Sequence, residues 1–294
     1  MEQLKAMQIF RAVAELRSFA QAAEQLNLPR PTVTNAVQSV EQHLGVRLLH
    51  RTTRKVSLTL EGGIYLERCT RVLNELDDME GLFAGPGAGT IRVDLPERLA
   101  RMQLLPRLPE FLNQYPSIRV RVGASDRFAD LVGEGIDCAV RVGQLRDSSL
   151  VARRIGALEQ VNLASRGYLA QYGVPRTLAD LAHHQAVNFF SSQSGRDMPW
   201  EYHEDGADFT VTMRSQLSVS STEAYTAACL AGVGLIQAPR MGVEELLASG
   251  ELVEVLPAWR PAPLPVSVVY AHNKHLSPRV RIFVDWVVSV LRVS

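Results

Sequence analysis

The sequence predicts an α/β protein in three parts: an N-terminal winged helix-turn-helix, a long helix, and a larger domain of alternating strands and helices. Short amphipathic segments and a basic hairpin pattern fill residues 1–59. A heptad pattern followed by a glycine-rich linker fills residues 60–89, and strand and helix signals alternate over residues 90–294. At roughly 150 residues per domain, a chain of 294 residues is long enough for about two globular domains.

The composition is that of a globular protein. Hydrophobic residues make up 46% and charged residues 21%, which argues against intrinsic disorder. The net charge is +0, but residues 1–60 hold eight Lys and Arg against four Asp and Glu, so the remainder is net acidic. A basic module on an acidic body is typical of a nucleic-acid binder with a separate sensing part. A solvated basic face explains the charge alone equally well.

Neither disulfide nor membrane signals are evident in the sequence. Cys69, Cys138 and Cys229 lie far apart and are odd in number, so they suit neither a disulfide framework nor a zinc site. The sequence has no run of about 18 apolar residues and no apolar signal segment at its start. We therefore expect a cytoplasmic protein.

Three short helices are predicted before the hairpin. Residues 4–14 carry apolar residues at helical spacing, and Ser18 with Gln21 three residues later is the pattern of a helix start. Pro31 suits the first turn of the third helix, and Gly45 suits its end. Alternating residues on both sides of the basic turn at residues 52–55 then predict a β-hairpin, the wing.

The third helix has a polar face suited to reading bases in the major groove. Thr and Asn side chains can hydrogen-bond base edges, and Arg side chains in this module suit guanine or phosphate. The alternative is a three-helix packing unit with a polar outer face. The candidate DNA-binding residues are Ser18, Arg30, Pro31, Thr32, Thr34, Asn35, Gln38, Arg51, Thr53, Arg54 and Lys55.

The long helix is predicted from about Leu60 to Phe83, with Thr59 as its cap. Leu66 and Leu73 repeat every seven residues, and a second set repeats with an offset of three, which is the pattern of a coiled-coil seam. No globular neighbour adjoins this helix in sequence, so we expect its seam to pack against a second copy. The candidate dimerisation residues of this homodimer are Leu66, Cys69, Leu73, Leu76 and Phe83.

The larger domain shows strand and helix signals but no catalytic motif. No G-x-S-x-G, H-E-x-x-H or phosphate-loop sequence occurs, and we expect no catalytic residue, no cofactor and no metal site. His183 and His184 are adjacent and do not share a helix face, which favours solvated histidines over metal ligands. A redox role for the cysteines is a further, weaker alternative. The alternation predicts largely parallel sheets in two lobes, a helix over residues 104–115, and a short helix capped by Asp126.

The sequence resembles the LysR-type transcriptional regulators. The resemblance is carried by Phe10-x-x-Val13-Ala14-Glu15-x-x-Ser18-Phe19-x-x-Ala22-Ala23-x-x-Leu26, and by Pro31-x-Val33-Thr34-x-x-Val37-x-x-Val40-Glu41-x-x-Leu44-Gly45 with the segment through Arg54. It continues through Asp126-Arg127, Gly135-x-Asp137, Arg141-x-Gly143 and Gly232-x-Gly234-Leu235. It implies a winged helix-turn-helix, a dimerising linker helix, and a two-lobed domain like periplasmic binding proteins with an effector site between the lobes. Oligomers larger than a dimer, such as a homotetramer, are also compatible with the resemblance.

The sequence departs from the family pattern at three places that bear on specificity. One is Ser220-Ser221-Thr222, where relatives often place an asparagine or aspartate. Pro29 and Arg30 stand where relatives usually have a serine followed by glutamine, so the base preference is expected to differ. At the first strand-to-helix turn of the larger domain, Arg98 lies near where many relatives carry a small hydroxyl residue.

The effector is expected to bind beyond the carboxyl ends of the strands. Helix N-termini at Asp126 and Thr222 and the charges of Arg98 and Arg141 favour an anion, so a carboxylate is the best hypothesis. The alternatives are that Arg98 pairs with a protein carboxylate and that Asp126 only caps a helix. The candidate effector-binding residues are Arg98, Ser125, Asp126, Arg141, Ser220, Ser221, Thr222 and Gln237.

These features together predict a sequence-specific, effector-responsive transcription regulator that binds double-stranded DNA. The alternative is a small-molecule-binding or enzymatic α/β domain with an accessory DNA-contacting module. The effector's identity, the target genes and the sign of regulation do not follow from the sequence.

Overall fold

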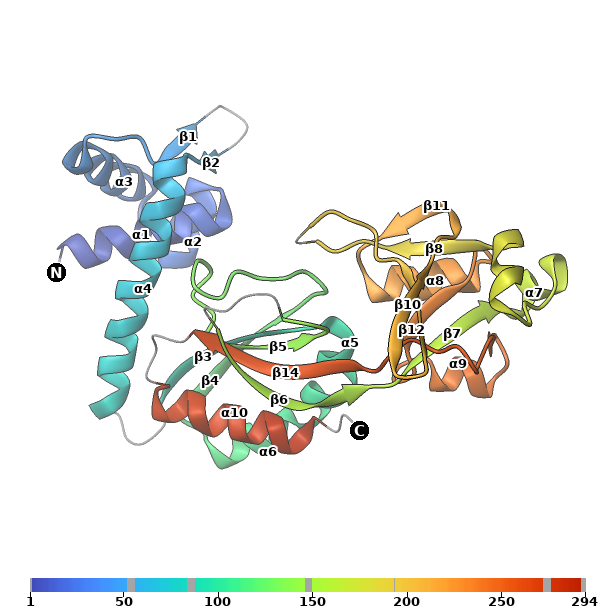
Figure 1. Cartoon of the computed structure of the whole chain (residues 1–294). Helices are drawn as coiled ribbons and strands as arrows, with labels where there is room; N and C mark the ends of the chain where they lie inside the picture. The colour runs from blue at the N-terminus through green and yellow to red at the C-terminus, as the bar shows by residue number, and fades with distance from the viewer. Residues whose placement is uncertain are drawn as a thin grey trace.

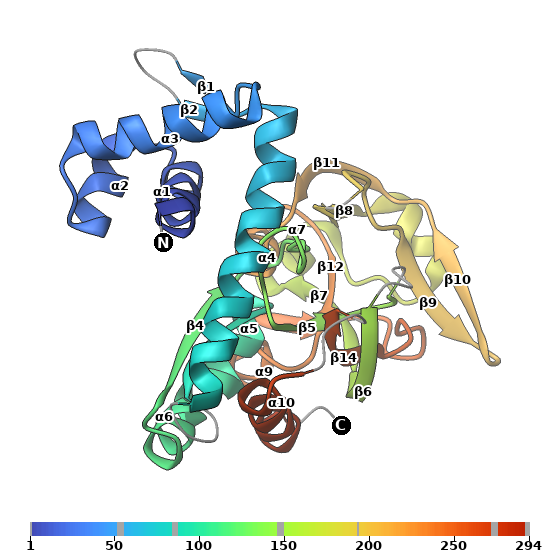
Figure 2. The ribbon, with the colours of Figure 1, turned by 90° about the vertical axis from the view of Figure 1, so that its left-hand side faces the viewer.

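The computed structural model describes residues 2–51, 56–83, 88–145, 150–192, 194–271 and 276–291. The N-terminal helices gather at one end of the long helix α4, which runs along the side of the larger domain (Figures 1 and 2). The larger domain is drawn out into two lobes. No helix within the described ranges is long and apolar enough to cross a membrane.

The N-terminal part is a helix-turn-helix with a wing, as predicted. Its elements are α1 (Glu2–Leu16), α2 (Phe19–Leu26), α3 (Arg30–Leu44), β1 (Leu49–Arg51) and β2 (Val56–Leu58), the strands pairing antiparallel. The Ser18 hydroxyl accepts a hydrogen bond from the Gln21 backbone N–H at 3.3 Å, which confirms the predicted cap of α2. Gly45 ends α3 at a φ of 70°, a conformation that favours glycine.

The core of this part includes the long helix. Phe10 and Val13 of α1 and Val33 and Val37 of α3 are fully buried. The Phe10 ring packs edge-on against Tyr65 of α4, with 5.1 Å between ring centroids. The helix α4 is therefore a structural member of the N-terminal unit.

Glu41 fixes the wing against the helix α3. Its side chain is buried, and its Oε1 accepts hydrogen bonds from the backbone N–H groups of Leu48 (2.9 Å) and Leu49 (3.2 Å). Arg47 adds an ion pair with Oε2 at 3.6 Å. Because a buried carboxylate needs such partners, these contacts set the position of β1 relative to α3.

The helix α4 (Leu60–Phe83) has the predicted bounds. Its N-terminus is capped by Thr59, whose hydroxyl accepts from the Gly62 N–H at 2.9 Å. A Cβ at Gly62 would lie 1.9 Å from the carbonyl oxygen of Leu48, so only glycine allows this close approach between α4 and the wing.

The first lobe is a five-stranded sheet with strand order β4-β3-β5-β14-β6. Its strands are β3 (Gly89–Leu95), β4 (Ile118–Ala124), β5 (Cys138–Val142), β6 (Leu150–Leu158) and β14 (Leu264–Ala271). The strand β3 runs parallel to β4 and β5, whereas β14 runs antiparallel to β5 and β6. Its helices are α5 (Glu97–Leu99), the π-helical turn η1 (Ala100–Leu104), α6 (Leu105–Gln114) and α10 (Pro278–Val290). Phe111 of α6 packs against Phe283 of α10 in the buried core.

The second lobe is built from shorter sheets. Its strands are β7 (Gln160–Ser165), β8 (Gln185–Phe189), β9 (Trp200–Glu204), β10 (Ala207–Val211), β11 (Arg214–Val219), β12 (Ile236–Pro239) and β13 (Leu252–Glu254). Its helices are α7 (Arg166–Tyr172), the 3₁₀ helix η2 (Leu178–His183), α8 (Thr222–Leu230) and α9 (Glu244–Ala248). The central strand β7 pairs antiparallel with β12 and β13, and β8 pairs parallel with β11. The chain enters this lobe between β6 and β7 and leaves it before β14.

Four predictions for the larger domain were wrong or incomplete. The sheets are mixed rather than largely parallel, because β14 returns from the second lobe against the direction of β5. The helix predicted to begin at Leu104 begins at Glu97, since a π-helical turn carries it through to α6. No helix follows Asp126, where the chain forms turns instead. The strand β9 and the helix α7 were not predicted.

One buried histidine in the second lobe makes its stability depend on pH. The His184 ring is buried, not solvated as the sequence predicted, and its Nδ1 lies 3.3 Å from the hydroxyl of Tyr168. That hydroxyl accepts from the Gln185 N–H at 2.9 Å, so its own hydrogen is available to an unprotonated Nδ1. Burial lowers the pKa of His184 below its ordinary 6.5, because the charged ring loses solvation.

We expect the second lobe to lose stability as the pH falls below about 6.5. Below this pH the His184 ring is protonated in the unfolded chain but not in the folded chain. The loss of stability therefore grows as the pH falls, until the lowered pKa of His184 in the folded chain is reached. Thermal unfolding of the wild type and His184→Asn between pH 7.5 and 5 measures this, with His183→Asn as an exposed control. Parallel pH curves for the wild type and His184→Asn would contradict the assignment.

Candidate functional site

The recognition helix α3 presents a polar, solvent-exposed face. Arg30, Thr32, Asn35 and Gln38 are exposed, while Val33 and Val37 on the opposite face are buried. The hydroxyl of Thr34 donates a hydrogen bond to the carbonyl oxygen of Arg30 at 3.1 Å. The Thr34 hydroxyl oxygen can therefore still accept a hydrogen bond from a base. Pro31 is exposed in the first turn, and Ser18 serves as the α2 cap.

The predicted phosphate contacts come from Arg51 and from the turn residues that follow it in sequence. Arg51 is the last residue of β1. Thr53, Arg54 and Lys55 lie outside the described residues. Their proposed DNA contacts remain predictions.

Two residues of the predicted dimer seam on α4 are covered within the chain itself. Cys69 is 1% exposed and packs in the N-terminal core, and Leu73 is 3% exposed. The helix therefore has neighbours within its own chain, and these two side chains are already covered. Leu66 and Leu76 are half-buried, and nothing is described for the side chain of Phe83. Among the described side chains of α4, the exposed large apolar ones are Leu60, Ile64, Val72 and Met79.

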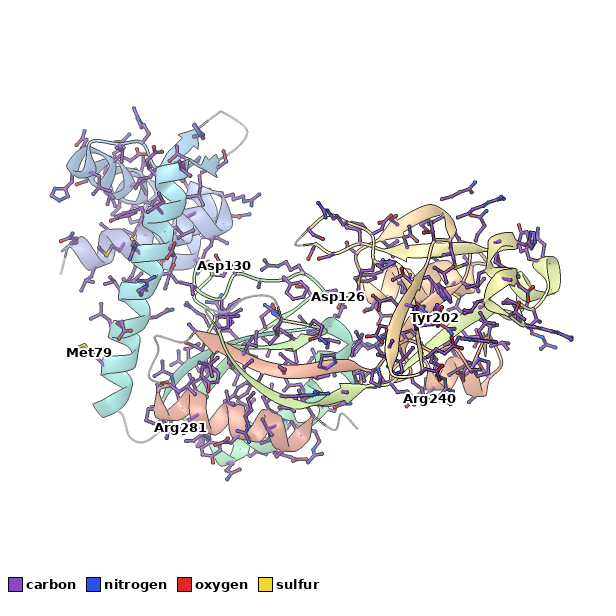
Figure 3. All side chains as sticks on the ribbon, in the orientation of Figure 1. Met79, Asp126, Asp130, Tyr202, Arg240 and Arg281 are labelled. Carbon is purple, nitrogen blue, oxygen red and sulfur yellow. The ribbon has the colours of Figure 1, made fainter. Side chains whose placement is uncertain are left out.

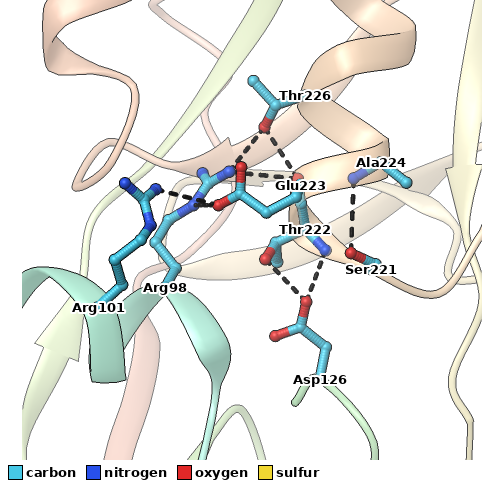
Figure 4. Close-up of polar contacts among 8 residues, drawn as sticks. All are labelled: Arg98, Arg101, Asp126, Ser221, Thr222, Glu223, Ala224 and Thr226. Atoms are coloured by element: carbon cyan, nitrogen blue, oxygen red, sulfur yellow. Dashed lines mark hydrogen bonds and ion pairs between the residues drawn. The ribbon is translucent and has the colours of Figure 1, made fainter. Parts of the chain in front are cut away.

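Arg98 joins the two lobes at the predicted effector site. It is 5% exposed, and its Nε lies 3.3 Å from Oε1 of Glu223 on α8 (Figure 4). Its Nη2 donates to the Thr226 hydroxyl (2.9 Å) and to the Thr222 carbonyl oxygen (3.2 Å). Arg101 reaches the same Oε1 of Glu223 at 3.2 Å, so two guanidinium groups of the first lobe share one carboxylate of the second.

Asp126 caps a helix, but one that belongs to the other lobe. Its Oδ2 accepts from the Thr222 backbone N–H at 2.6 Å and from the Thr222 hydroxyl at 2.8 Å (Figure 4). A carboxylate at the first turn of α8 is favoured by the helix dipole. Ser221 caps the same helix from within the lobe by accepting from the Ala224 N–H at 3.5 Å.

The remaining candidate effector residues do not join the contact between Arg98 and Glu223. Arg141, expected to offer a charge to the effector, is buried and donates to Asp94 Oδ1 at 2.7 Å and to the Ala129 carbonyl oxygen. The side-chain amide of Gln237 forms hydrogen bonds with the Asn162 side chain and with the backbone of Glu201. Ser125 and Ser220 are half-buried near the ends of β4 and β11.

Arg101, Glu223 and Thr226 were not predicted from the sequence. Glu223 and Thr226 lie within the first five residues of α8, where only Thr222 was singled out. The available signal was an acidic residue in the first turn of a helix, but this pattern is common at helix starts and does not point to a distant arginine.

The cysteines offer no reactive thiol. All three are free and buried. Burial raises the pKa of Cys229 to about 12, and it also raises the pKa of Cys69 and Cys138. Since the thiolate is the nucleophile, these positions are unsuited to redox sensing. The described residues contain no group of three His, Cys, Asp or Glu side chains that could hold a metal ion.

A winged helix-turn-helix, a long linker helix and a two-lobed domain joined by polar contacts define a ligand-responsive DNA-binding regulator. Family models agree: residues 4–63 match the bacterial regulatory helix-turn-helix protein, lysR family, and residues 84–292 match the LysR substrate binding domain. The chain belongs to the LysR family of transcriptional regulators. It is a DNA-binding regulator whose activity is modulated by a small-molecule effector.

Similar proteins cover the whole chain. An uncharacterised HTH-type transcriptional regulator of Escherichia coli, YhjC, is 40% identical, with 99% of each chain covered. An HTH-type transcriptional repressor of Pseudomonas aeruginosa is 37% identical, covering 99% of this chain and 92% of the relative. The full-length structure of the Vibrio cholerae virulence activator AphB is similar with a TM-score of 0.65 and 29% identity, covering 97% and 98%. Of these three, one is described as a repressor and one as an activator.

Proposed function

We propose that this regulator reads its site with the exposed polar face of α3, and that it acts in the cytoplasm without catalytic activity. The observation that carries this proposal is the segregation of Arg30, Thr32, Asn35 and Gln38 from the buried face of the same helix. Hydrogen-bonding side chains at the N-terminal half of such a helix suit base edges in the major groove. We further propose the division into residues 1–59 for DNA binding, 60–89 for the linker and dimerisation, and 90–294 for the effector.

We expect Asn35→Ala to lower discrimination between cognate and random DNA by roughly 1–3 kcal/mol, which is about 5- to 150-fold. Arg54→Ala should instead weaken binding to cognate and random DNA alike. It should also reduce the salt slope of binding by about one, because the Arg54 side chain is expected to neutralise a phosphate. Fluorescence anisotropy with a duplex selected from a random library by the wild type measures both effects. Asn113→Ala, exposed on α6, is the control.

An equal loss of cognate and random binding in Asn35→Ala would contradict its base-reading role. If the wild type selects no sequence from the library, the proposed specific DNA binding itself is wrong.

We propose that the effector carries a carboxylate and binds at Arg98 and Arg101. The support comes from the protein's own chemistry, because these two guanidinium groups already hold the Glu223 carboxylate at 3.3 and 3.2 Å. Arg98 is buried whereas Arg101 is exposed, so the pair combines a desolvated anchor with an accessible one. A carboxylate effector would take the place of Glu223 at the two arginines. Binding of the effector would therefore also break the contact between the lobes at Glu223.

We expect small carboxylates to raise the melting temperature of the wild type, and Glu223→Gln to respond at lower concentration because the competing carboxylate is gone. Arg98→Ala should lose the response. A thermal-shift comparison of acetate, succinate and benzoate with the corresponding amides measures this on all three proteins. Equal stabilisation of the wild type and Arg98→Ala by the acids would remove Arg98 as the anchor, and stabilisation by the amides alone would contradict an anionic effector.

We also propose a homodimer formed through α4. The exposed apolar side chains Ile64, Val72 and Met79 recur at intervals of eight and seven residues and therefore lie along one side of the helix. Figure 3 shows Met79 pointing away from the lobes. This seam replaces the one through Cys69 and Leu73.

A further inference from the structure

Residues 126–135 form a segment that contacts both the second lobe and the long helix. The segment connects β4 to β5 within the first lobe and folds as turns. Figure 3 shows Asp130 beside α4 and Asp126 towards the second lobe. The segment thus spans the distance between the inter-lobe contact and the helix that carries the DNA-binding part.

At one end the segment is bonded to the second lobe. Asp126 accepts two hydrogen bonds from Thr222 at the start of α8, at 2.6 and 2.8 Å. Two residues further on, the Phe128 N–H donates to the Ser192 hydroxyl at 3.2 Å. Thr222 also offers its carbonyl oxygen to Arg98, so this end shares a residue with the proposed effector contact.

At the other end the segment is bonded to α4. The Asn74 amide donates to the Gly135 carbonyl oxygen at 3.4 Å and accepts from Arg92 of β3 at 2.9 Å. Gly135 is buried at a φ of 65°, and a Cβ there would lie 2.4 Å from Cγ2 of the buried Thr70. The helix and the segment are therefore in close steric contact as well as hydrogen-bonded.

Hydrogen bonds and an ion pair within the segment connect its two ends. Arg127 forms a two-pronged ion pair with Glu134, and Glu134 Oε1 also accepts from the Asp130 N–H. Asp130 Oδ1 in turn accepts from the N–H groups of Val132 and Gly133. Nη2 of Arg141 on β5 donates a hydrogen bond to the Ala129 carbonyl oxygen at 3.0 Å. Such internal bonds favour movement of the segment as one unit, which would carry a shift at Asp126 to Gly135.

We propose that the 126–135 segment is the mechanical link between effector and DNA, with Asp126 sensing the position of α8 and Asn74 transferring it to α4. The proposal rests on the proposed effector function of the inter-lobe contact. When Glu223 leaves Arg98, α8 is free to shift, Thr222 pulls or releases Asp126, and the contact of Gly135 with Asn74 and Thr70 changes. Asn74 is here a positioning residue that contacts neither effector nor DNA.

The test uses the full chain and needs no effector. Hydrogen–deuterium exchange over residues 70–76 is measured in the wild type, Asp126→Ala, Asn74→Ala and the double variant. We expect Asp126→Ala to raise exchange there at least threefold, and to add nothing further in the Asn74→Ala background. Asp285→Ala, which removes an exposed ion pair with Arg153 in the same lobe, and Glu75→Ala on α4 should leave exchange unchanged.

DNA affinity for the selected duplex provides the second readout. Asp126→Ala should change it at least threefold, and this change should vanish in the Asn74→Ala background. Thr222→Ala, which removes one of the two bonds to Asp126, should give a smaller change of the same sign and covers the case in which Asp126→Ala folds poorly. Unchanged exchange in Asp126→Ala, or equal effects in both backgrounds, would overturn the link. If the wild type selects no duplex, the proposed DNA-reading function fails while the exchange measurement still decides the link.

Discussion

Replacing Asp94 by alanine is expected to destabilise the first lobe by about 3–5 kcal/mol, the cost of leaving a buried charge without its partner. Asp94 and Arg141 are 3% and 5% exposed, and their side chains meet at 2.7 Å. Arg141 also lies over the Phe128 ring, 5.4 Å from its centroid. In a domain of this size such a loss lowers the melting temperature by roughly 10 °C.

The double variant Asp94→Ala/Arg141→Met provides the control. Removing both charges replaces an ion pair with apolar side chains, which is often close to neutral, so most of the stability should return. Scanning calorimetry of the full chain measures all three proteins. If Asp94→Ala melts like the wild type, the pair is not structural, and Arg141 regains its standing as a candidate effector anchor.

Local signals in the sequence were sufficient for the N-terminal part. Ser18, Thr59 and Gly45 act within four residues of themselves, and their patterns predict helix ends without knowledge of the rest of the fold. The buried faces of α1 and α3 follow from helical spacing in the same way. This is why the helix-turn-helix, the wing and the bounds of α4 were predicted correctly.

The inter-lobe contact could be predicted only in part because its partners are distant in sequence. Arg98 and Glu223 are 125 residues apart, and no periodicity relates them. Asp126 does cap a helix, but a residue that caps the following helix and one that caps a distant helix look alike in sequence. Arg141 between two valines carries no sign that Asp94 of a neighbouring strand neutralises it.

The heptad pattern of α4 illustrates a different limit. A seam of apolar residues predicts that a helix face is buried, but not against what. Cys69 and Leu73 are covered by other parts of the same chain, whereas Val72 and Met79 are exposed. The neighbouring position Val72 belongs to the same apolar stripe in sequence, so only the fold separates the intrachain face from the free one.

Substituting Val72 by aspartate is expected to raise the dissociation constant of the dimer more than about 100-fold. Val72 is 41% exposed on α4, between Ile64 and Met79, and a seam through these side chains would bury the new charge without a partner. Because a two-fold dimer places two recognition helices on one DNA site, the variant should also lose the gain in affinity that a symmetric site gives over a half-site.

Sedimentation velocity of the variant across a concentration series measures dissociation, with Val233→Asp, exposed on the second lobe, as the matched control. Leu73→Asp is expected to behave differently. Leu73 is covered within one chain, so its charge should lower the melting temperature of the monomer before it affects association. A Val72→Asp protein that sediments as the wild-type dimer, together with a folded and monomeric Leu73→Asp, would restore the original seam and place the intrachain packing of α4 in error.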